Sequence, residues 1–284
     1  MMKLRKAESD LYIPSGDEPE SVFAGTTHLA IGAHQDDIEI FAYHGILECF
    51  QEAEKGFAAV IATNGAGSPR AGRYAAFDDA RMKAIRLEEQ RKAASLGEYR
   101  FVAQLGYPSR EIKDPENADP VEDLTELLQA TRPEVLYLHN PADKHDTHIA
   151  VLARSLEAVR RLPVASRPGR VLGCEVWRDL DWLPDALKVP LPVDGHPNLA
   201  AALLGVFDSQ ITGGKRYDLA TEGRRLANAT FFQSHVVDDC QRITFAMDLT
   251  ELFHDEERSL ESFVLELVSA FEKDVRERVR KATA

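Results

Sequence analysis

Cysteine, basic charge and long apolar segments are all in short supply in this chain of 284 residues. Its three cysteines, Cys49, Cys174 and Cys240, are far apart and form no C-x-x-C pair, which excludes a disulfide framework and a thiolate zinc site. We expect them to be buried thiols. No segment has the ~18 consecutive apolar residues of a membrane span, and the N-terminus lacks the apolar core of a signal peptide. We therefore expect a cytoplasmic protein without membrane insertion.

Basic residues are too few to balance the acidic ones. The chain has 34 Lys and Arg against 47 Asp and Glu, a formal net charge of -13 at pH 7. Nucleic acids and anionic membranes bind clustered basic residues that displace counterions from phosphates, so both partners are disfavoured. A small-molecule substrate, neutral or cationic, fits this charge better.

What the sequence does contain is a regular alternation of buried strands and helices. Strands expected at 27–34, 56–65, 99–107 and 133–140 are followed in turn by helical spacing at 38–56, 79–97, 119–131 and about 145–162. This alternation predicts an α/β fold of the Rossmann-like class, a mostly parallel sheet with helices on both faces. We expect one domain over 1–284, with a core at about 25–165 and an elaborated C-terminal extension at 166–284.

The pattern of the C-terminal extension is less regular. A strand is expected at 171–177, a proline-rich stretch covers 183–197, and a helix is expected at 198–210. Near the C-terminus an amphipathic helix places five apolar side chains on one face: Leu260, Phe263, Val264, Leu267 and Phe271. We expect this face to pack on the core; the alternative is a contact between copies in a homo-oligomer.

The turn after the first strand carries the first chemically informative residues. Ligands of open α/β sheets bind at the carboxyl ends of the strands. This turn has an imidazole and two carboxylates, His34, Asp36 and Asp37, where a dinucleotide-binding protein would have Gly-x-Gly-x-x-Gly. His34 and Asp37 are three residues apart and can aim at one metal ion. The side chain of Asp36 is expected to point in a different direction from that of Asp37, but it can reach a water bound to that ion.

The turn after the fourth strand repeats this pattern with Asp143, His145 and His148. The two turns together can supply three nitrogen or oxygen ligands and a spare imidazole, which predicts a catalytic metal site. Such donors suit Zn²⁺, although Fe²⁺, Co²⁺ or Mn²⁺ can occupy the same kind of site. The loop at 64–74 contains Arg70 and Arg73 and is either a lid over a sugar hydroxyl or phosphate or a solvated loop.

Three motifs, in order, resemble those of the PIG-L/LmbE-like deacetylases, also called the N-acetylglucosaminylphosphatidylinositol de-N-acetylase family. The first is AHQDDIEIFAYHGI, the second comprises Arg86, Glu89, Ala93, Ala94, Leu96 and Gly97 followed by LGYPS, and the third comprises Asp143, His145 and His148. The resemblance covers roughly residues 27 to 235.

The resemblance implies a zinc-dependent amidohydrolase that removes the acetyl group from a GlcNAc-like amino sugar or glycoconjugate. Zinc would be held by His34, Asp37 and His148, and Asp36 would be the general base. His145 would stabilise the oxyanion as an imidazolium and help to protonate the leaving amine, and Asp143 would orient His145. The alternatives are a metal-dependent hydrolase of a non-sugar amide and a non-catalytic carbohydrate-binding relative.

The chain departs from the family pattern at three positions. Gln35 stands where Pro is usual, His44 replaces the first Gly of a Gly-Gly pair, and Thr147 replaces an Asp that would be a partner for His145. His44 is expected either in the substrate pocket or packed in the core. Ser209-Gln210 resembles a distal Ser-Gln pair of the family, and Arg86 and Glu89 are spaced for a structural ion pair.

Overall fold

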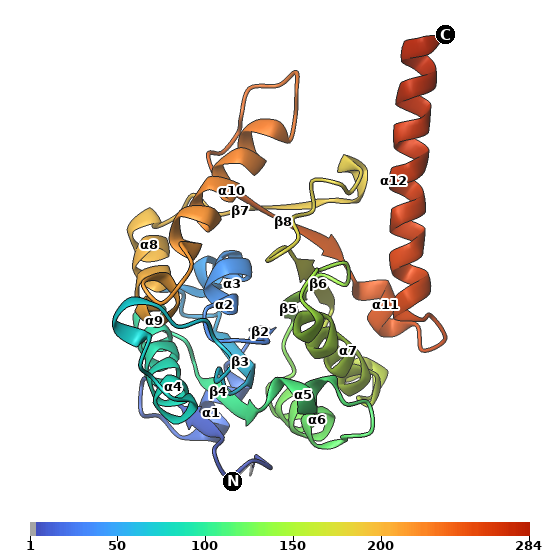
Figure 1. The fold of residues 1–284 in the computed structure, drawn as a ribbon. Helices are drawn as coiled ribbons and strands as arrows, with labels where there is room; N and C mark the ends of the chain where they lie inside the picture. Colours follow the sequence, from blue (N-terminus) through green and yellow to red (C-terminus); the bar gives the residue numbers. More distant parts are fainter. Residues whose placement is uncertain (1–3) are drawn as a thin grey trace.

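A single eight-stranded sheet organises the computed structural model, which describes residues 4–284 (Figure 1). The strands are β1 (Asp10–Tyr12), β2 (His28–Gly32), β3 (Phe57–Thr63), β4 (Val102–Tyr107), β5 (Val135–His139), β6 (Arg170–Cys174), β7 (Val189–Pro192) and β8 (Ile243–Asp248). Their order is β1-β4-β3-β2-β5-β6-β8-β7. The five central strands from β4 to β6 are parallel, and β1, β7 and β8 pair antiparallel at the two ends.

The connecting segments are mainly helical. The α-helices are α1 (Pro19–Ala24), α2 (Asp37–Phe41), α3 (Tyr43–Cys49), α4 (Asp79–Leu96), α5 (Ser109–Lys113), α6 (Asp119–Thr131), α7 (Asp146–Arg160), α8 (Pro197–Gly205), α9 (Asp208–Ile211), α10 (Tyr217–Phe231), α11 (Thr250–His254) and α12 (Leu260–Thr283). The Rossmann-like α/β fold expected from the alternation of strands and helices is confirmed.

The sheet is buried on both faces, as parallel sheets are. Alternate residues of β2 point into two separate apolar cores, Leu29 and Ile31 into one and Ala30 into the other. Helices α6 and α7 complete the first core, and α2, α3 and α8 complete the second. Covered on both sides, the central strands leave only their ends open to ligands.

Two parts of the expected pattern differ in the structure. The helix expected at 38–56 is broken at Ala42 and ends at Cys49, because Phe50 is extended and Gln51 has a positive φ of 61°. Strands β1 and β8 and helix α10 were not expected. Strands β6, β7 and β8, all from the C-terminal extension, join the same sheet as the core strands.

Helix α12 stands at one side of the molecule, and its C-terminal end lies apart from the sheet (Figure 1). Of the expected apolar face, Phe263 is buried and Leu260, Val264 and Leu267 are partly buried against the first core. Phe271, by contrast, is 38% exposed.

Within residues 4–284 no helix is both long enough and apolar enough to cross a membrane. Of the cysteines, Cys49 and Cys174 are buried thiols, whereas Cys240 is partly exposed.

Candidate active site and metal centre

Two neighbouring parallel strands bring the predicted ligands to one edge of the sheet. β2 and β5 pair with Ala30 opposite Tyr137, so the turns that follow them lie close together. The turn after β2 contains His34 and leads into α2, which begins at Asp37. The turn after β5 leads into α7, for which His145 is the N-cap.

Three donor atoms from these turns form a nearly equilateral triangle. His34 Nδ1 lies 3.3 Å from Asp37 Oδ2 and 3.3 Å from His148 Nε2, and His148 Nε2 lies 3.4 Å from Asp37 Oδ2. An ion bound tetrahedrally, with bonds of ~2.0 to 2.1 Å to nitrogen and oxygen, has ligand atoms about 3.4 Å apart. The three expected ligands are therefore spaced like one face of a tetrahedral metal site, which leaves the fourth position free.

The protonation states of His34 and Asp37 also suit a metal. Burial lowers the pKa of His34 to about 4, so its ring is neutral at pH 7, as a ligand must be. Burial would raise the pKa of Asp37, but the rings of His148 and His139 outweigh it and hold that pKa well below its usual range. Asp37 Oδ2 also accepts the backbone N–H groups of Ala33 and His34, at 3.1 and 2.7 Å. Asp37 is thus an ionised and firmly oriented carboxylate. Burial would lower the pKa of His148, but Asp37 and Asp143 outweigh it and raise that pKa, so the ring would release its proton when a metal binds.

Asp143 supports His148 and not His145. Its Oδ2 lies 3.1 Å from His148 Nδ1. The same carboxylate accepts backbone N–H groups from Lys144, Trp177 and Arg178. A carboxylate on the far nitrogen of a metal-binding histidine fixes the orientation and tautomer of the ring. The expectation that Asp143 orients His145 is therefore corrected: Asp143 is a positioning residue for His148.

His139, the last residue of β5, is a further member of the cluster that sequence reasoning missed. Its fully buried ring stacks on that of His148 at a centroid distance of 3.8 Å, and its Nε2 lies 2.9 Å from the backbone nitrogen of Ala33. With Asp37 and His148 it forms a second group of donors close enough to hold an ion, beside the group of His34, His145 and His148. Its place at the end of an expected strand was a signal that could have identified it.

Asp36 occupies a strained position beside the triangle. It is the N-cap of α2 with a φ of 97°, a left-handed conformation that non-glycine residues rarely adopt. Burial raises the pKa of Asp36 well above its usual range; Arg86 opposes this shift, and the carboxylates of Asp37 and Glu39 add to it. Asp36 is thus a nearly buried carboxylate with a high proton affinity next to the metal ligands.

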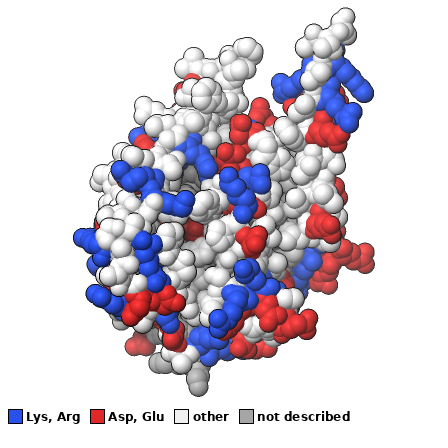
Figure 2. Space-filling view, viewed as in Figure 1, with Lys and Arg blue, Asp and Glu red and all other residues white. Residues whose placement is uncertain are grey.

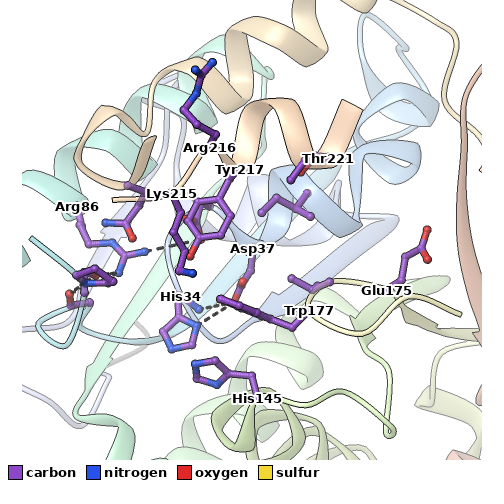
Figure 3. Close-up of a pocket in the computed structure, with 18 of the residues that line it drawn as sticks. His34, Asp37, Arg86, His145, Glu175, Trp177, Lys215, Arg216, Tyr217 and Thr221 are labelled. Atoms are coloured by element: carbon purple, nitrogen blue, oxygen red, sulfur yellow. Dashed lines mark hydrogen bonds and ion pairs between the residues drawn. The ribbon is translucent and has the colours of Figure 1, made fainter. Parts of the chain in front are cut away.

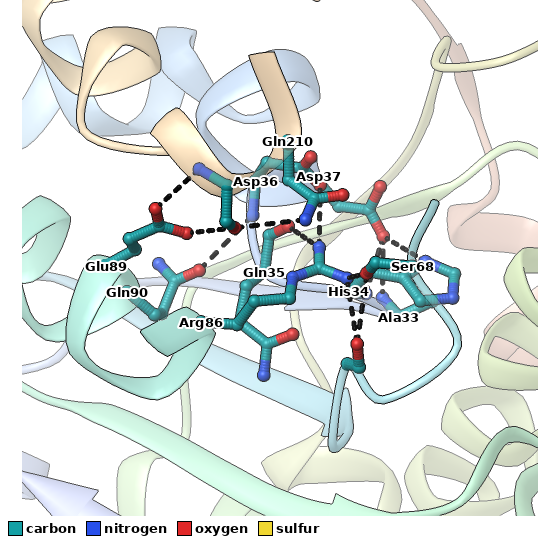
Figure 4. A network of polar contacts seen from close by, with 12 residues as sticks. Ala33, His34, Gln35, Asp36, Asp37, Ser68, Arg86, Glu89, Gln90 and Gln210 are labelled. Atoms are coloured by element: carbon teal, nitrogen blue, oxygen red, sulfur yellow. Dashed lines mark hydrogen bonds and ion pairs between the residues drawn. The ribbon is translucent and has the colours of Figure 1, made fainter. Parts of the chain in front are cut away.

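Arg86 holds the turn that contains Asp36 (Figure 4). Its guanidinium lies 3.7 Å from Asp36 Oδ1, and it donates to the backbone oxygen of Gln35 and to Ser68 Oγ. The expected ion pair with Glu89 is not found among the described residues, because Glu89 instead accepts the backbone N–H and the hydroxyl of Ser209. The second motif therefore connects helix α4 to the catalytic turn and to α9.

His145 lies beside His34 and His148, and a hydrogen bond sets which of its two ring nitrogens carries the proton. Its Nδ1 accepts the backbone N–H of Thr147 at 3.3 Å, so the proton of the neutral ring lies on Nε2. The ring stacks on His148 at 4.5 Å and meets His34 edge-on at 4.9 Å. Burial and the nearby His148 lower the pKa of His145. With its proton on Nε2, the neutral ring presents an N–H donor, whereas the expected imidazolium role stays a prediction. The backbone N–H of Thr147 donates to Nδ1, so it does not supply the acceptor that an Asp at this position would offer.

A cavity of about 730 Å³ opens over this cluster (Figure 3). Its lining residues come from the turn after β2, the loop after β3, the segment after β6 and the start of α10, and include His34, Asp36, Asp37, Gly65, Ser68, Arg86, His145, Glu175, Trp177, Gln210, Lys215, Tyr217, Arg224 and Arg225. Trp177 and Tyr217 meet edge-on with ring centroids 6.2 Å apart. This volume falls within the range of small-molecule binding sites.

The three residues expected to contact substrate do not line the cavity. Arg70 donates to the backbone oxygens of Ala66 and Phe77 within its own loop. Arg73 pairs with Asp208, and His44 Nδ1 lies 3.0 Å from Tyr137 Oη. The loop after β3 does reach the cavity, but through other residues: Gly65, Gly67, Ser68 and Pro69.

The remaining lining residues were missed by sequence reasoning. Trp177, Lys215, Tyr217, Arg224 and Arg225 belong to the C-terminal extension and to no motif noted in the sequence. The Ser209-Gln210 pair was noted, and the structure places Ser209 against Glu89 and Gln210 in the cavity wall.

Comparison with known proteins adds a family match. Residues 29–159 match the family model described as PIG-L, GlcNAc-PI de-N-acetylase. This segment contains the two turns that carry His34, Asp36, Asp37, His145 and His148. No curated protein matches the chain.

Solved structures of low sequence identity share the fold. The N,N'-diacetylchitobiose deacetylase from Pyrococcus horikoshii is 17% identical with a TM-score of 0.59, and the alignment covers 86% of this chain and 91% of the deacetylase chain. The A40926 pseudoaglycone deacetylase Dbv21 is 13% identical with a TM-score of 0.57, and the alignment covers 79% of this chain and 97% of the Dbv21 chain. GalB, the 4-carboxy-2-hydroxymuconate hydratase from Pseudomonas putida KT2440, is 17% identical with a TM-score of 0.60, and the alignment covers 79% of this chain and 96% of the GalB chain. These likenesses establish the fold, which serves more than one reaction.

Proposed function

We propose that the protein is a metal-dependent N-deacetylase of an amino sugar or glycoconjugate, because residues 29–159 match the family model described as PIG-L, GlcNAc-PI de-N-acetylase. The observation that carries the proposal is the triangle of His34, Asp37 and His148 beside the cavity, with donor atoms 3.3, 3.3 and 3.4 Å apart. Asp36 and His145 remain beside it as groups free for chemistry. A metal ion, a base and a hydrogen-bond donor are what amide hydrolysis requires.

His34, Asp37 and His148 would hold the ion. When bound, Zn²⁺ would supply a water of lowered pKa and would polarise the amide carbonyl. Fe²⁺, Co²⁺ and Mn²⁺ suit the same two nitrogens and one carboxylate, and supply of the metal in the cell then decides which is used.

Asp36 would take the proton of the attacking water. Its raised pKa brings it closer to the pH at which a general base works best. Arg86 holds the turn and keeps the carboxylate beside the ligands. Once protonated, Asp36 carries the proton that the leaving amine needs, so that amide and water become amine and carboxylic acid with no further proton source.

His145 would donate from Nε2 to the amide oxygen as it becomes an oxyanion. The bond from Thr147 to Nδ1 sets this tautomer before substrate arrives. A fixed donor aimed at developing charge stabilises the transition state without reorganisation. The neutral ring suffices for this role, since the proton for the amine comes from Asp36.

The cavity wall favours a sugar ring above the metal centre. Trp177 and Tyr217 offer aromatic surface, on which the apolar faces of sugars pack. By its name, the similar enzyme from Pyrococcus horikoshii acts on an N-acetylated amino sugar. We therefore place a GlcNAc-like group first among substrates, and a non-sugar amide second.

The proposal is tested by amine release from GlcNAc, N,N'-diacetylchitobiose and UDP-GlcNAc. Metal-stripped protein should be inactive and should regain activity when Zn²⁺ is restored. The matched control is Asp36→Asn, which keeps the size of the side chain and removes the base. If the restored protein binds metal but releases no amine from any of the three, deacetylation of GlcNAc-like groups is refuted and a non-sugar amide or a non-catalytic role takes its place.

A further inference from the structure

We propose that the cavity recognises an N-acyl substrate that carries an anionic group, a phosphate or carboxylate, bound by Lys215, which precedes α10, and by Arg224 within α10. The inference rests on the proposed function, because the same cavity would place the amide of that substrate at the metal centre. It also revises the expectation, drawn from the net charge of -13, of a neutral or cationic substrate.

Basic side chains gather at the cavity in spite of the acidic composition of the chain. Lys215, Arg216, Arg224 and Arg225 all line it, from one short segment that leads into and along α10. Figure 2 shows Lys and Arg side chains around a hollow in the face that is viewed. A local field of this kind attracts anions to a cleft whatever the net charge of the molecule.

Three of these four cations, Lys215, Arg224 and Arg225, make no ion pair with a carboxylate within the described part of the chain; the exception is Arg216. Arg216 is paired with Asp218 at 2.9 and 2.7 Å and points away from the metal ligands (Figure 3). Lys215 lies over the ring of Trp177, 5.1 Å from its centroid, and its ammonium points toward His34 beside Tyr217 (Figure 3). Lys215 is therefore a cation left free for a ligand.

Arg224 and Arg225 extend the basic wall. Arg224 donates one N–H to the backbone oxygen of Val176, which leaves its other donors for a ligand. Arg225 is only 2% exposed and donates to the backbone oxygens of Glu39 and Ile40, but its Nε has no hydrogen-bond partner. Burial lowers the pKa of Arg225 to about 10, and the charges of Tyr43, Glu222 and Glu175 only partly oppose this shift. A buried guanidinium with an unpartnered donor and no ion pair is costly, and a bound anion nearby would offset that cost.

The carboxylates that line the cavity do not neutralise this wall. Asp36 and Asp37 belong to the metal centre. Glu175 is the third, and its two oxygens are occupied by the backbone N–H groups of Leu180 and Phe245 and by the amide of Asn228. Burial raises the pKa of Glu175, and the charge of Arg224 opposes that shift, but among the described residues Glu175 makes no ion pair with Arg224 or Lys215. Both cations therefore keep donors that a substrate can meet.

In this proposal the amide of the substrate lies at His34 and Asp37, its ring meets Trp177 and Tyr217, and its anionic group meets Lys215 and Arg224. Phosphate and carboxylate share the chemistry that this wall recognises, since both accept several charge-assisted hydrogen bonds.

Anion binding is tested first without any reaction. Inorganic phosphate and malonate are titrated calorimetrically into metal-stripped protein, so that neither can bind through a metal ion. Lys215→Ala and Arg224→Ala should each weaken binding about 10-fold relative to the wild type, and Lys215→Arg should restore it. The control is Lys273→Ala on α12, whose side chain is 78% exposed and far from any proposed contact. Absence of binding to the wild type, or equal binding by all variants, overturns the inference.

Turnover then separates this inference from the proposed function. With Zn²⁺ restored, kcat/KM is compared for N,N'-diacetylchitobiose, GlcNAc 6-phosphate and N-acetylmuramate, which are neutral, phosphorylated and carboxylated. The preference for an anionic substrate over the neutral one should fall about 10-fold in Lys215→Ala. Amine release without any anionic preference in the wild type refutes the inference and leaves deacetylation standing. Phosphate binding that the variants lose, with no amine release from any substrate, leaves the anion site standing and refutes deacetylation.

Discussion

Replacement of Asp143 by asparagine should weaken metal binding without touching a ligand. Asp143 Oδ1 accepts the N–H groups of Lys144 and Arg178, and Oδ2 accepts that of Trp177 and lies 3.1 Å from His148 Nδ1. Each oxygen therefore faces two donors. An asparagine has one oxygen and one NH₂ group, so in either orientation its NH₂ would point at two donors and lose both bonds.

The magnitude follows from these contacts. Loss of the carboxylate behind a metal-binding histidine costs about 10- to 100-fold in metal affinity, which corresponds to about 1.4 to 2.7 kcal/mol. Two lost hydrogen bonds to a buried acceptor should lower the free energy of unfolding of the metal-stripped protein by about 2 to 4 kcal/mol.

Competition with a chelator gives the Zn²⁺ affinity, and urea titration of metal-stripped protein gives the stability. Asp146→Asn is the matched control, because Asp146 is exposed in the first turn of α7 and makes no contact with His148 among the described residues. A Zn²⁺ affinity in Asp143→Asn equal to that of the wild type would show that His148 needs no carboxylate behind it, and the reasoning would fail.

Three further predictions concern His145, Glu39 and Gly65. His145→Gln should retain metal and lower kcat about 100- to 1,000-fold through loss of the oxyanion donor; a wild-type kcat would remove that role. Burial raises the pKa of Glu39 to about 7 from 4.5, so the folded protein holds a proton that the unfolded chain releases, and stability is lost as pH rises through this window. Glu39→Gln should therefore stabilise metal-stripped protein by at most about 3 kcal/mol above pH 7 and by little at pH 4.5, and a gain independent of pH would contradict this. A Cβ on Gly65, whose φ is +71°, would lie 2.6 Å from Gln35 Oε1 and 2.8 Å from Arg86 Cδ, so Gly65→Ala should cost about 1 to 3 kcal/mol in urea titration. Gly67→Ala meets nothing within 4 Å and should be neutral; equal effects of the two would refute the steric argument.

The close approach of His34, Asp37 and His148 was predictable because it depends on local spacing and on one rule of topology. His34 and Asp37 follow one parallel strand, His148 follows another, and the carboxyl ends of parallel strands meet at one edge. The same rule applies to His139, the last residue of β5, although it lies before the turn on which the sequence motifs fall. Asp143 belongs to the cluster as expected but faces His148 and not His145, since sequence spacing does not say which ring a carboxylate faces.

The lining of the cavity was not predictable in the same way. Arg70 and Arg73 were the basic residues of a loop at the correct edge, yet both turn back to bond within the protein. Lys215 and Arg224 reach the cavity because α10 packs against α8 and β8, a long-range arrangement with no local signature. Side-chain direction in a loop depends on such packing, and periodicity carries no information about it.

The central claim is that His34, Asp37 and His148 hold an ion while Asp36 performs chemistry beside it. The most direct test compares wild type with Asp36→Asn and His148→Ala by titrating Zn²⁺ into metal-stripped protein and measuring amine release from N,N'-diacetylchitobiose on the same samples. The account predicts that wild type and Asp36→Asn bind Zn²⁺ alike, that only the wild type releases amine, and that His148→Ala does neither. Full activity in Asp36→Asn, or unchanged Zn²⁺ binding in His148→Ala, would contradict it.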